Sequence, residues 1–299
     1  ECAMLTCPGL HEPAAATVGR LQTLWRTIKK KPLGGFSAAL LVVIVLMAIF
    51  ADVLAPYDPL ETHPEIRLSA PSRTHPFGTD DIGRDVLSRI IHGARISLWV
   101  GLLAVGIGTA AGMLIGLVCG YWEGQIDLIV QRIMDAIQAI PALVLALAIV
   151  SVLRPSTTNA MLAIAIVIIP GNSRIVRGAV LTAKQNRYVE AAQAMGCRHP
   201  RIITSHILPN VTAPILVIAS IWLGNAILIE ATLSFLGVGT QPPTPSWGLM
   251  LSSTGRAFME QAPWLAIFPG LAISLAVLGF NLFGDTLRDA WDPKLRRQG

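Results

Sequence analysis

The chain has 299 residues, of which 53% are hydrophobic and only 14% are charged, with a formal net charge of +5. Soluble domains carry about 25% charged residues, because a large surface in water needs them. This composition excludes a disordered chain and disfavours an ordinary soluble enzyme. It favours a protein that crosses a membrane several times.

Six stretches of the chain lack charged residues and are each about 18 residues long or longer, which is enough for a helix to cross a bilayer. Lipid offers the backbone no hydrogen-bond partner, so a span must be a helix or a barrel strand. Barrel strands alternate in polarity over about 10 residues, and these unbroken runs do not. We predict an all-α polytopic membrane protein with six transmembrane helices, at residues 32–51, 96–122, 136–153, 155–173, 207–229 and 261–284.

These spans divide the chain into four parts. They are an N-terminal tail (1–31), a first transmembrane helix with an external loop and an amphipathic helix (32–95), a core of helices 2–6 with a loop at 174–209 (96–285), and a C-terminal tail (286–299). With both termini cytoplasmic, 16 of the 23 Lys and Arg residues lie on the cytoplasmic side and 7 outside. The positive-inside rule favours this orientation. Basic residues this dispersed, without a binding motif, predict no nucleic-acid partner.

The segment before the second span predicts an amphipathic helix over residues 82–95. Its apolar residues share one face, and its polar residues include Arg84, Asp85 and Arg89. Such a helix suits the outer membrane surface, in contact with lipid. His92 lies in the same segment, and we interpret it as a surface residue rather than a metal ligand.

The second span carries small residues at every fourth position, at 104, 108, 112, 116 and 120. This ridge would let another helix approach closely. A groove that lines a substrate path is the alternative, but tight helix packing is the better interpretation.

The polar loop at 174–209 contains two apolar stripes. Tyr188, Val189, Ala192 and Met195 follow a helical spacing, and Ile202, Ile203 and Ile207 form a second short stripe. Gly196 suits the left-handed end of a helix, and Pro200 can open the next one. We predict two short helices that project from the membrane and fit a pocket on another protein.

Residues 241–245, of sequence QPPTP, cannot form a regular helix. They predict a loop on the outer side, directly before Ser246 and Trp247.

The motifs of these segments resemble those of one family. Glu190-Ala191-Ala192, then Gly196, then Leu208-Pro209 resembles the EAA loop of permeases from ATP-binding-cassette (ABC) importers, although His206 stands where the general pattern has Ile. The segments FGTD (77–80), GRD (83–85), SFLG (234–237), QPPTPSWG (241–248) and FNLFGD (280–285) are similar to those of the second permease subunit of dipeptide and oligopeptide importers.

The resemblance implies a type I ABC-importer permease fold in the plasma (inner) membrane and import of dipeptides or short oligopeptides. It implies that the EAA loop couples to a cytoplasmic ATPase, through Tyr188, Glu190, Ala191, Ala192, Met195, Gly196, Leu208 and Pro209. It also implies an external gate, or a surface that meets a substrate-binding protein, at Gln241, Pro242, Pro243 and Trp247.

The implied partners are a second homologous permease subunit, ATP-binding subunits and an extracytoplasmic binding protein. The chain has no G-x-x-x-x-G-K-[ST] motif, so we expect it to bind no cofactor, with ATP and Mg²⁺ held by partner subunits. No residue is assigned to the substrate pathway, because half of its lining would come from the partner permease.

Three alternatives remain. The same architecture imports nickel chelates or glutathione in related systems. An ion-coupled secondary transporter would carry ionisable groups near the midplane of the membrane, whereas Asp52, Asp135, Glu230 and Asp285 lie at predicted span ends. An intramembrane protease would need a motif such as H-E-x-x-H or G-x-S-x-G, and the chain has neither.

Overall fold

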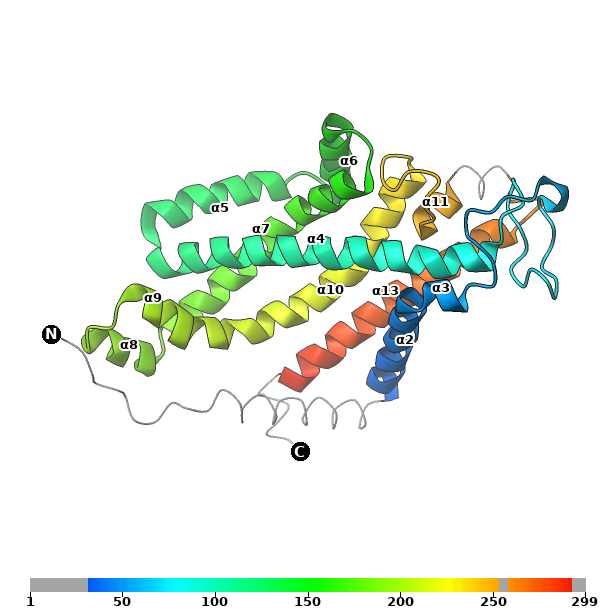
Figure 1. The fold of residues 1–299 in the computed structure, drawn as a ribbon. Helices are drawn as coiled ribbons and strands as arrows, with labels where there is room; N and C mark the ends of the chain where they lie inside the picture. The colour runs from blue at the N-terminus through cyan, green and yellow to red at the C-terminus, as the bar shows by residue number, and fades with distance from the viewer. Residues whose placement is uncertain (1–31, 253–257, 292–299) are drawn as a thin grey trace.

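A computed structural model of the chain describes residues 32–252 and 258–291, and these residues form helices and loops without a strand (Figure 1). The predicted tail at 1–31 and residues 292–299 lie outside the described ranges. The elements are α2 (Pro32–Ile49), α3 (Ala51–Leu54), a 3-10 turn (Pro64–Ile66), α4 (Val86–Trp122), α5 (Gly124–Gln138), α6 (Ala142–Leu153), α7 (Thr157–Lys184), α8 (Arg187–Ala194), α9 (His199–Ile202), a π-turn (Ile203–Ile207), α10 (Leu208–Phe235), α11 (Trp247–Leu251) and α13 (Trp264–Trp291).

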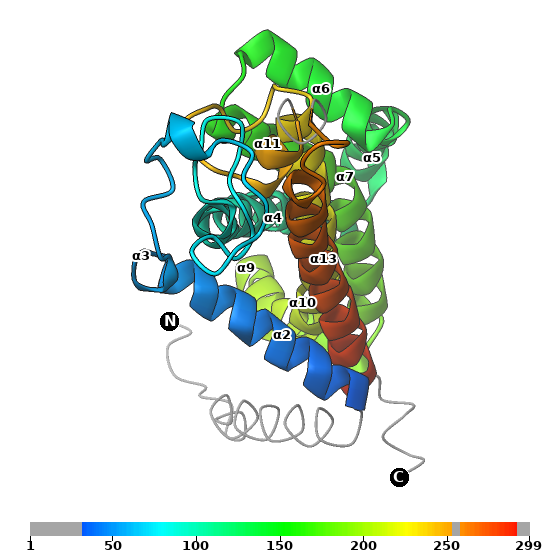
Figure 2. The same ribbon diagram turned by 90° about the vertical axis from the view of Figure 1, so that its right-hand side faces the viewer.

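The long helices form an elongated bundle with two different ends. Helices α8 and α9 lie together at one end, and α11, α3 and the loop that follows α3 lie at the other (Figure 1). We call these the α8–α9 end and the α11 end. Viewed along the bundle from the α11 end, α2 crosses in front of the other helices and meets α13 (Figure 2).

Within residues 32–252 and 258–291, four helices are long and apolar enough to cross a membrane: α4, α7, the continuous helix His199–Phe235 and Trp264–Asp289. The bent pair α5–α6 makes a fifth if it counts as one span. The apolar part of α2, Leu33–Ile49, is shorter. The all-α membrane fold is therefore confirmed, whereas the six predicted spans become four full-length helices, one bent pair and one shorter apolar helix.

The third predicted span, 136–153, is wrong as a single straight helix. Helix α5 ends at Gln138, α6 begins at Ala142, and the two axes meet at 90°. Pro141 lies at the bend, where its extended backbone forms the N-cap of α6. Proline lacks the amide hydrogen that would continue a helix, and its ring clashes with the preceding turn. The hydropathy pattern alone could not show this break.

The small-residue ridge of α4 packs directly against α7. A Cβ atom added to Gly108 would lie 2.7 Å from the carbonyl oxygen of Ala165, and one added to Gly116 would lie 2.5 Å from that of Ser173. Only glycine lets the two backbones come this close. Asn172 of α7 also donates a hydrogen bond of 2.9 Å to Thr109 Oγ1. The interpretation of the ridge as tight helix packing is confirmed.

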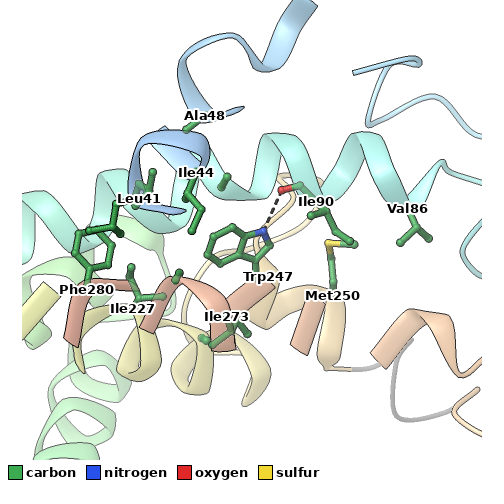
Figure 3. Close-up of a cluster of buried hydrophobic side chains, with 14 of the residues drawn as sticks. Leu41, Ile44, Ala48, Val86, Ile90, Ile227, Trp247, Met250, Ile273 and Phe280 are labelled. Atoms are coloured by element: carbon green, nitrogen blue, oxygen red, sulfur yellow. Dashed lines mark hydrogen bonds between the residues drawn. The ribbon is translucent and has the colours of Figure 1, made fainter. Parts of the chain in front are cut away.

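In the part of the chain that the structure describes, the core consists of three clusters along the bundle. One lies at the α11 end, between α2, α4, α10, α11 and α13. A second lies in the middle, between α4, α6, α7 and α10, and a third fills the α8–α9 end. Figure 3 shows the first cluster, in which Trp247 lies among side chains of α2, α4, α10 and α13 and donates a hydrogen bond of 3.0 Å to the Ile90 carbonyl oxygen.

We expect Trp247→Ala to lower the free energy of unfolding by about 3–5 kcal/mol, because the substitution leaves a large cavity and removes the hydrogen bond to the Ile90 carbonyl oxygen. Trp247 is completely buried. Trp99→Ala is the matched control, because Trp99 on α4 is 61% exposed and should change stability little. Thermal unfolding of the two variants in detergent measures the difference, and equal midpoints would contradict the role of Trp247 in the core.

Candidate functional site

The α8–α9 end contains the loop whose motifs resemble the EAA loop, within residues 174–209. Helix α8 spans Arg187–Ala194, and the chain reverses at Gly196, whose φ of +75° favours glycine. Val189 and Ala192 of α8 are buried against Ile202 and Ile207. The first short helix and the glycine turn are therefore confirmed, and the apolar contacts of α8 hold the loop against the bundle.

The second short helix differs from the prediction. Helix α9 continues through the π-turn into α10, so that residues 199–235 form one helix. The π-turn lies directly before Leu208 and Pro209, and the Leu208 amide donates to the Ile203 carbonyl oxygen, five residues back. A wider turn absorbs the missing amide hydrogen of Pro209 without ending the helix. Helix α7 likewise extends to Lys184, so the predicted loop at 174–209 is shorter than expected.

The apolar stripe of α8 points in two directions. Val189 and Ala192 face the bundle, but Tyr188 is exposed and Met195 is 67% exposed. Glu190, Ala191 and Pro209 are exposed as well, and Leu208 is half-buried. The stripe is therefore not a single buried face. An exposed methionine and tyrosine on a projecting loop are side chains that favour protein interfaces.

Hydrogen bonds join the base of this loop to the ends of α4 and α7. The Tyr121 hydroxyl lies 2.7 Å from His199 Nδ1. Lys184 Nζ donates to the Tyr121 carbonyl oxygen at 2.8 Å and to Glu123 Oε1 at 2.7 Å. A displacement of the loop is thereby linked to α4 and α7 and, because His199 lies in the continuous helix 199–235, to α10.

Acidic groups on α5 and at the turn before it form ion pairs with basic groups on α7, and the sequence alone does not pair them. The pairs are Asp127–Arg177, Asp135–Arg174 and Glu123–Lys184. Acids at 123, 127 and 135 and bases at 174, 177 and 184 share a helical spacing, but only the antiparallel packing of the two elements shows which groups pair.

At the α11 end, the predicted interfacial helix is not a separate element. Residues 86–95 form the first turns of α4, so the predicted boundary at 95 falls inside a helix of 37 residues. Asp85 caps this helix by accepting a hydrogen bond of 2.8 Å from the Ser88 amide, and it also pairs with His75. Arg89 is buried and donates to the Pro59 carbonyl oxygen at 3.1 Å.

These polar groups therefore contact the loop that follows α3 rather than lipid. Arg84 forms an ion pair with Asp80 in the same loop. His92, which we expected at the surface, is half-buried and lies 3.3 Å from Asp52. Arg95 donates two hydrogen bonds to Asp52, and this arginine holds the pKa of the exposed Asp52 carboxyl below its usual range. The prediction of a polar face on residues 82–95 was correct, but other parts of the chain cover this face.

The loop between α10 and α11, residues 236–246, is irregular as predicted. Gln241, Pro242 and Pro243 are exposed, whereas Trp247 is completely buried and therefore cannot form part of an exposed gate. Beside the exposed residues lies an open hollow of about 470 Å³. Its lining comes from the end of α10, this loop and α11: Phe235, Leu236, Gly237, Gln241, Pro242, Leu249 and Ser252.

The position of Glu230 differs from the prediction. We placed this carboxyl group at a span end, but it lies inside α10 and is completely buried. Hydroxyl groups of Ser97, Ser234 and Thr240 donate hydrogen bonds to it. Ser234 and Thr240 follow Glu230 within ten residues and are a local signal for a polar site, whereas the pairing with Ser97 of α4 leaves none.

Comparison with known proteins gives consistent matches over most of the chain. Residues 112–297 match the family described as binding-protein-dependent transport system inner membrane component, and residues 19–71 match the N-terminal TM domain of oligopeptide transport permease C. The dipeptide transport system permease protein DppC of Alkalihalophilus pseudofirmus is 47% identical over 272 residues, which cover 91% of this chain and 89% of that protein.

Two further relatives carry different substrate names. The di/tripeptide transport system permease protein DppC of Pseudomonas aeruginosa is 43% identical and covers 95% of this chain and 96% of its own length. The glutathione transport system permease protein GsiD of Escherichia coli is 44% identical, and the match covers 91% of this chain and 90% of that protein.

A similar solved structure is the MetNI methionine ABC transporter in an inward-facing conformation. One of its chains superimposes with a TM-score of 0.57 at 18% sequence identity, covering 69% of the present chain and 98% of its own. At this identity the match concerns the fold, and it agrees with the arrangement of helices described above.

Proposed function

Because the chain belongs to the family of binding-protein-dependent transport system inner membrane components, we propose that it is a permease subunit that imports dipeptides or short oligopeptides. The observation that carries this proposal is the 47% identity to a dipeptide permease over nine-tenths of both chains. The membrane-spanning helices provide the conduit, and the chain carries no phosphate-binding motif of its own. The energy for transport therefore comes from partner subunits that bind ATP and Mg²⁺.

The exposed face of α8 and the glycine turn support the proposed contact with an ATP-binding subunit. In this arrangement both termini and the α8–α9 end are cytoplasmic, in keeping with the distribution of Lys and Arg. The α11 end then faces outward, where the loop 236–246 receives an extracytoplasmic binding protein. A second, homologous permease subunit completes the pathway.

Glutathione is a second candidate substrate, because one relative at 44% identity is named as a glutathione permease. Glutathione is itself a short peptide, so the two substrates differ in side chains and linkage rather than in chemical class. The binding protein is expected to decide between them.

Uptake by the reconstituted complex tests the proposal. We expect proteoliposomes that contain this chain, its partner permease and the ATP-binding subunits to accumulate a labelled dipeptide only with ATP and the binding protein present. The purified chain alone should hydrolyse no ATP. Labelled glutathione and a labelled nickel chelate, in separate arms, measure the alternatives. Uptake driven by an ion gradient without ATP would overturn the proposal, as would uptake of glutathione or the nickel chelate without any uptake of dipeptide.

A further inference from the structure

Three segments of the chain, α10, α4 and the loop 236–246, meet at the side chain of Glu230. Ser234 Oγ donates to Oε1 at 2.7 Å from the same helix, and Ser97 Oγ of α4 donates to Oε2 at 3.2 Å. Thr240 Oγ1 of the loop 236–246 donates to Oε1 at 3.2 Å. Ser246, which caps α11, is also a neighbour of this carboxyl group. The loop is thus attached to Glu230 at Thr240 and approaches it again at its last residue.

The backbones of the loop and of the adjoining α11 lie very close to α10 around this carboxyl group. The Thr240 amide donates to Ser234 Oγ at 2.9 Å. A Cβ atom added to Gly239 would lie 2.3 Å from Ser234 Oγ, and one added to Gly248 would lie 2.3 Å from the Ala231 carbonyl oxygen. The loop therefore has little room to shift while the contacts to Glu230 persist.

The attachment is directly beside the exposed part of the loop. Thr240 is buried, whereas the next three residues, Gln241, Pro242 and Pro243, are exposed. Gln241 Nε2 bonds back to the carbonyl oxygens of Gly237 and Gly239, at 3.0 and 3.1 Å. Interface residues that are fixed in advance lose less conformational freedom on binding. A buried carboxyl group can thus determine the shape of a surface that it does not reach.

We propose that Glu230 is a positioning residue that fixes loop 236–246 in the shape that receives the binding protein. The part of this inference that concerns the binding protein rests on the proposed function. A proton relay is the competing role for a buried carboxyl group in a membrane, but it would need titratable neighbours. The hydrogen-bond partners of Glu230 within the described residues are hydroxyl groups, which favours a role in holding the loop in place.

The first test measures the loop itself. Val238→Cys introduces a thiol on the loop, at a side chain that packs against the middle core cluster. A membrane-impermeant maleimide labels this thiol in vesicles that contain the full complex. Loss of the anchoring hydrogen bonds should raise the labelling rate about fivefold or more in Glu230→Ala. Glu230→Gln, which keeps one acceptor oxygen, should raise it less. Thr232→Val is the matched control, because the Thr232 hydroxyl donates to the Leu228 carbonyl oxygen of the same helix rather than to Glu230.

The second test measures the response of ATP hydrolysis to the binding protein. We expect Glu230→Ala to raise the half-saturating concentration of binding protein about fivefold while the maximal rate stays within about twofold. A purely structural defect would lower the maximal rate and the yield together. If Glu230→Ala does not fold, Thr240→Val removes only the contact from the loop and should give the same shift at smaller size.

Unchanged labelling in Glu230→Ala, or in Thr240→Val if only that variant folds, would overturn the anchoring role. A normal half-saturating concentration alongside faster labelling would overturn the link to the binding protein. The labelling result does not depend on transport, so a wild-type complex that fails to import dipeptides would refute the proposed function and leave the anchor standing.

Discussion

Gly116→Val should abolish the folded bundle or reduce its yield in the membrane at least about tenfold, the largest effect on stability that we expect. A Cβ atom at this position would lie 2.5 Å from the Ser173 carbonyl oxygen and 2.7 Å from Val176 Cβ. Both contacts belong to the facing helix α7, and one is with its backbone, which cannot turn aside as a flexible side chain could. Helices α4 and α7 would have to separate along their shared seam.

The same substitution at Gly106 is the matched control for this prediction. Gly106 also lies in α4, but it is exposed, and a Cβ atom added there would meet no atom within 4 Å. Gly106→Val should leave the yield and the melting temperature in detergent close to those of the wild type. Equal behaviour of the two variants would show that the seam is not closely packed.

The ridge of small residues illustrates what the sequence could predict. A spacing of four residues defines one face of a helix, and small residues on that face indicate a neighbouring backbone. The pattern does not say which helix is the neighbour. That Ala165, Ser173 and Val176 of α7 fill this role follows only from the packed bundle.

Helix ends were predicted less well than helices, because charges marked the limits of the predicted spans. Helix α7 continues past Arg174 and Arg177 to Lys184, since each of these bases has an acidic partner on α5 or at the turn before it. Helix α4 begins ten residues before its predicted span, because Asp85 caps it and the loop after α3 surrounds Arg89. A charge-free run finds the apolar part of a helix, not its full length.

In the candidate sites, too, local features could be predicted from the sequence and long-range contacts could not. The turn at Gly196 and the short helix before it follow from local patterns. The burial of Trp247 and Glu230 does not, because it depends on segments more than 100 residues away, at Ile90 and Ser97. Long-range contacts of this kind leave no local signal in a single sequence.

Met195→Glu should remove the ATP-binding subunit from the purified complex and lower dipeptide uptake at least about tenfold. Met195 is 67% exposed at the tip of the turn after α8, so the substitution breaks no packing within the chain. It would instead bring a carboxylate into the pocket of the partner that the methionine occupies in the proposed complex. A buried charge without a counter-charge is costly, and the interface would open.

Three comparisons separate this loss from a general defect. Met195→Leu preserves the apolar contact and should retain both the partner subunit and uptake. Met259→Glu makes the same change at a methionine that is 54% exposed near the start of α13, on the α11 end, and it should retain the ATP-binding subunit. Ala192→Glu places the charge in the buried core of the loop and should lower the melting temperature as well. Met195→Glu is expected to melt like the wild type, and full retention of the ATP-binding subunit by this variant would place the contact elsewhere on the chain.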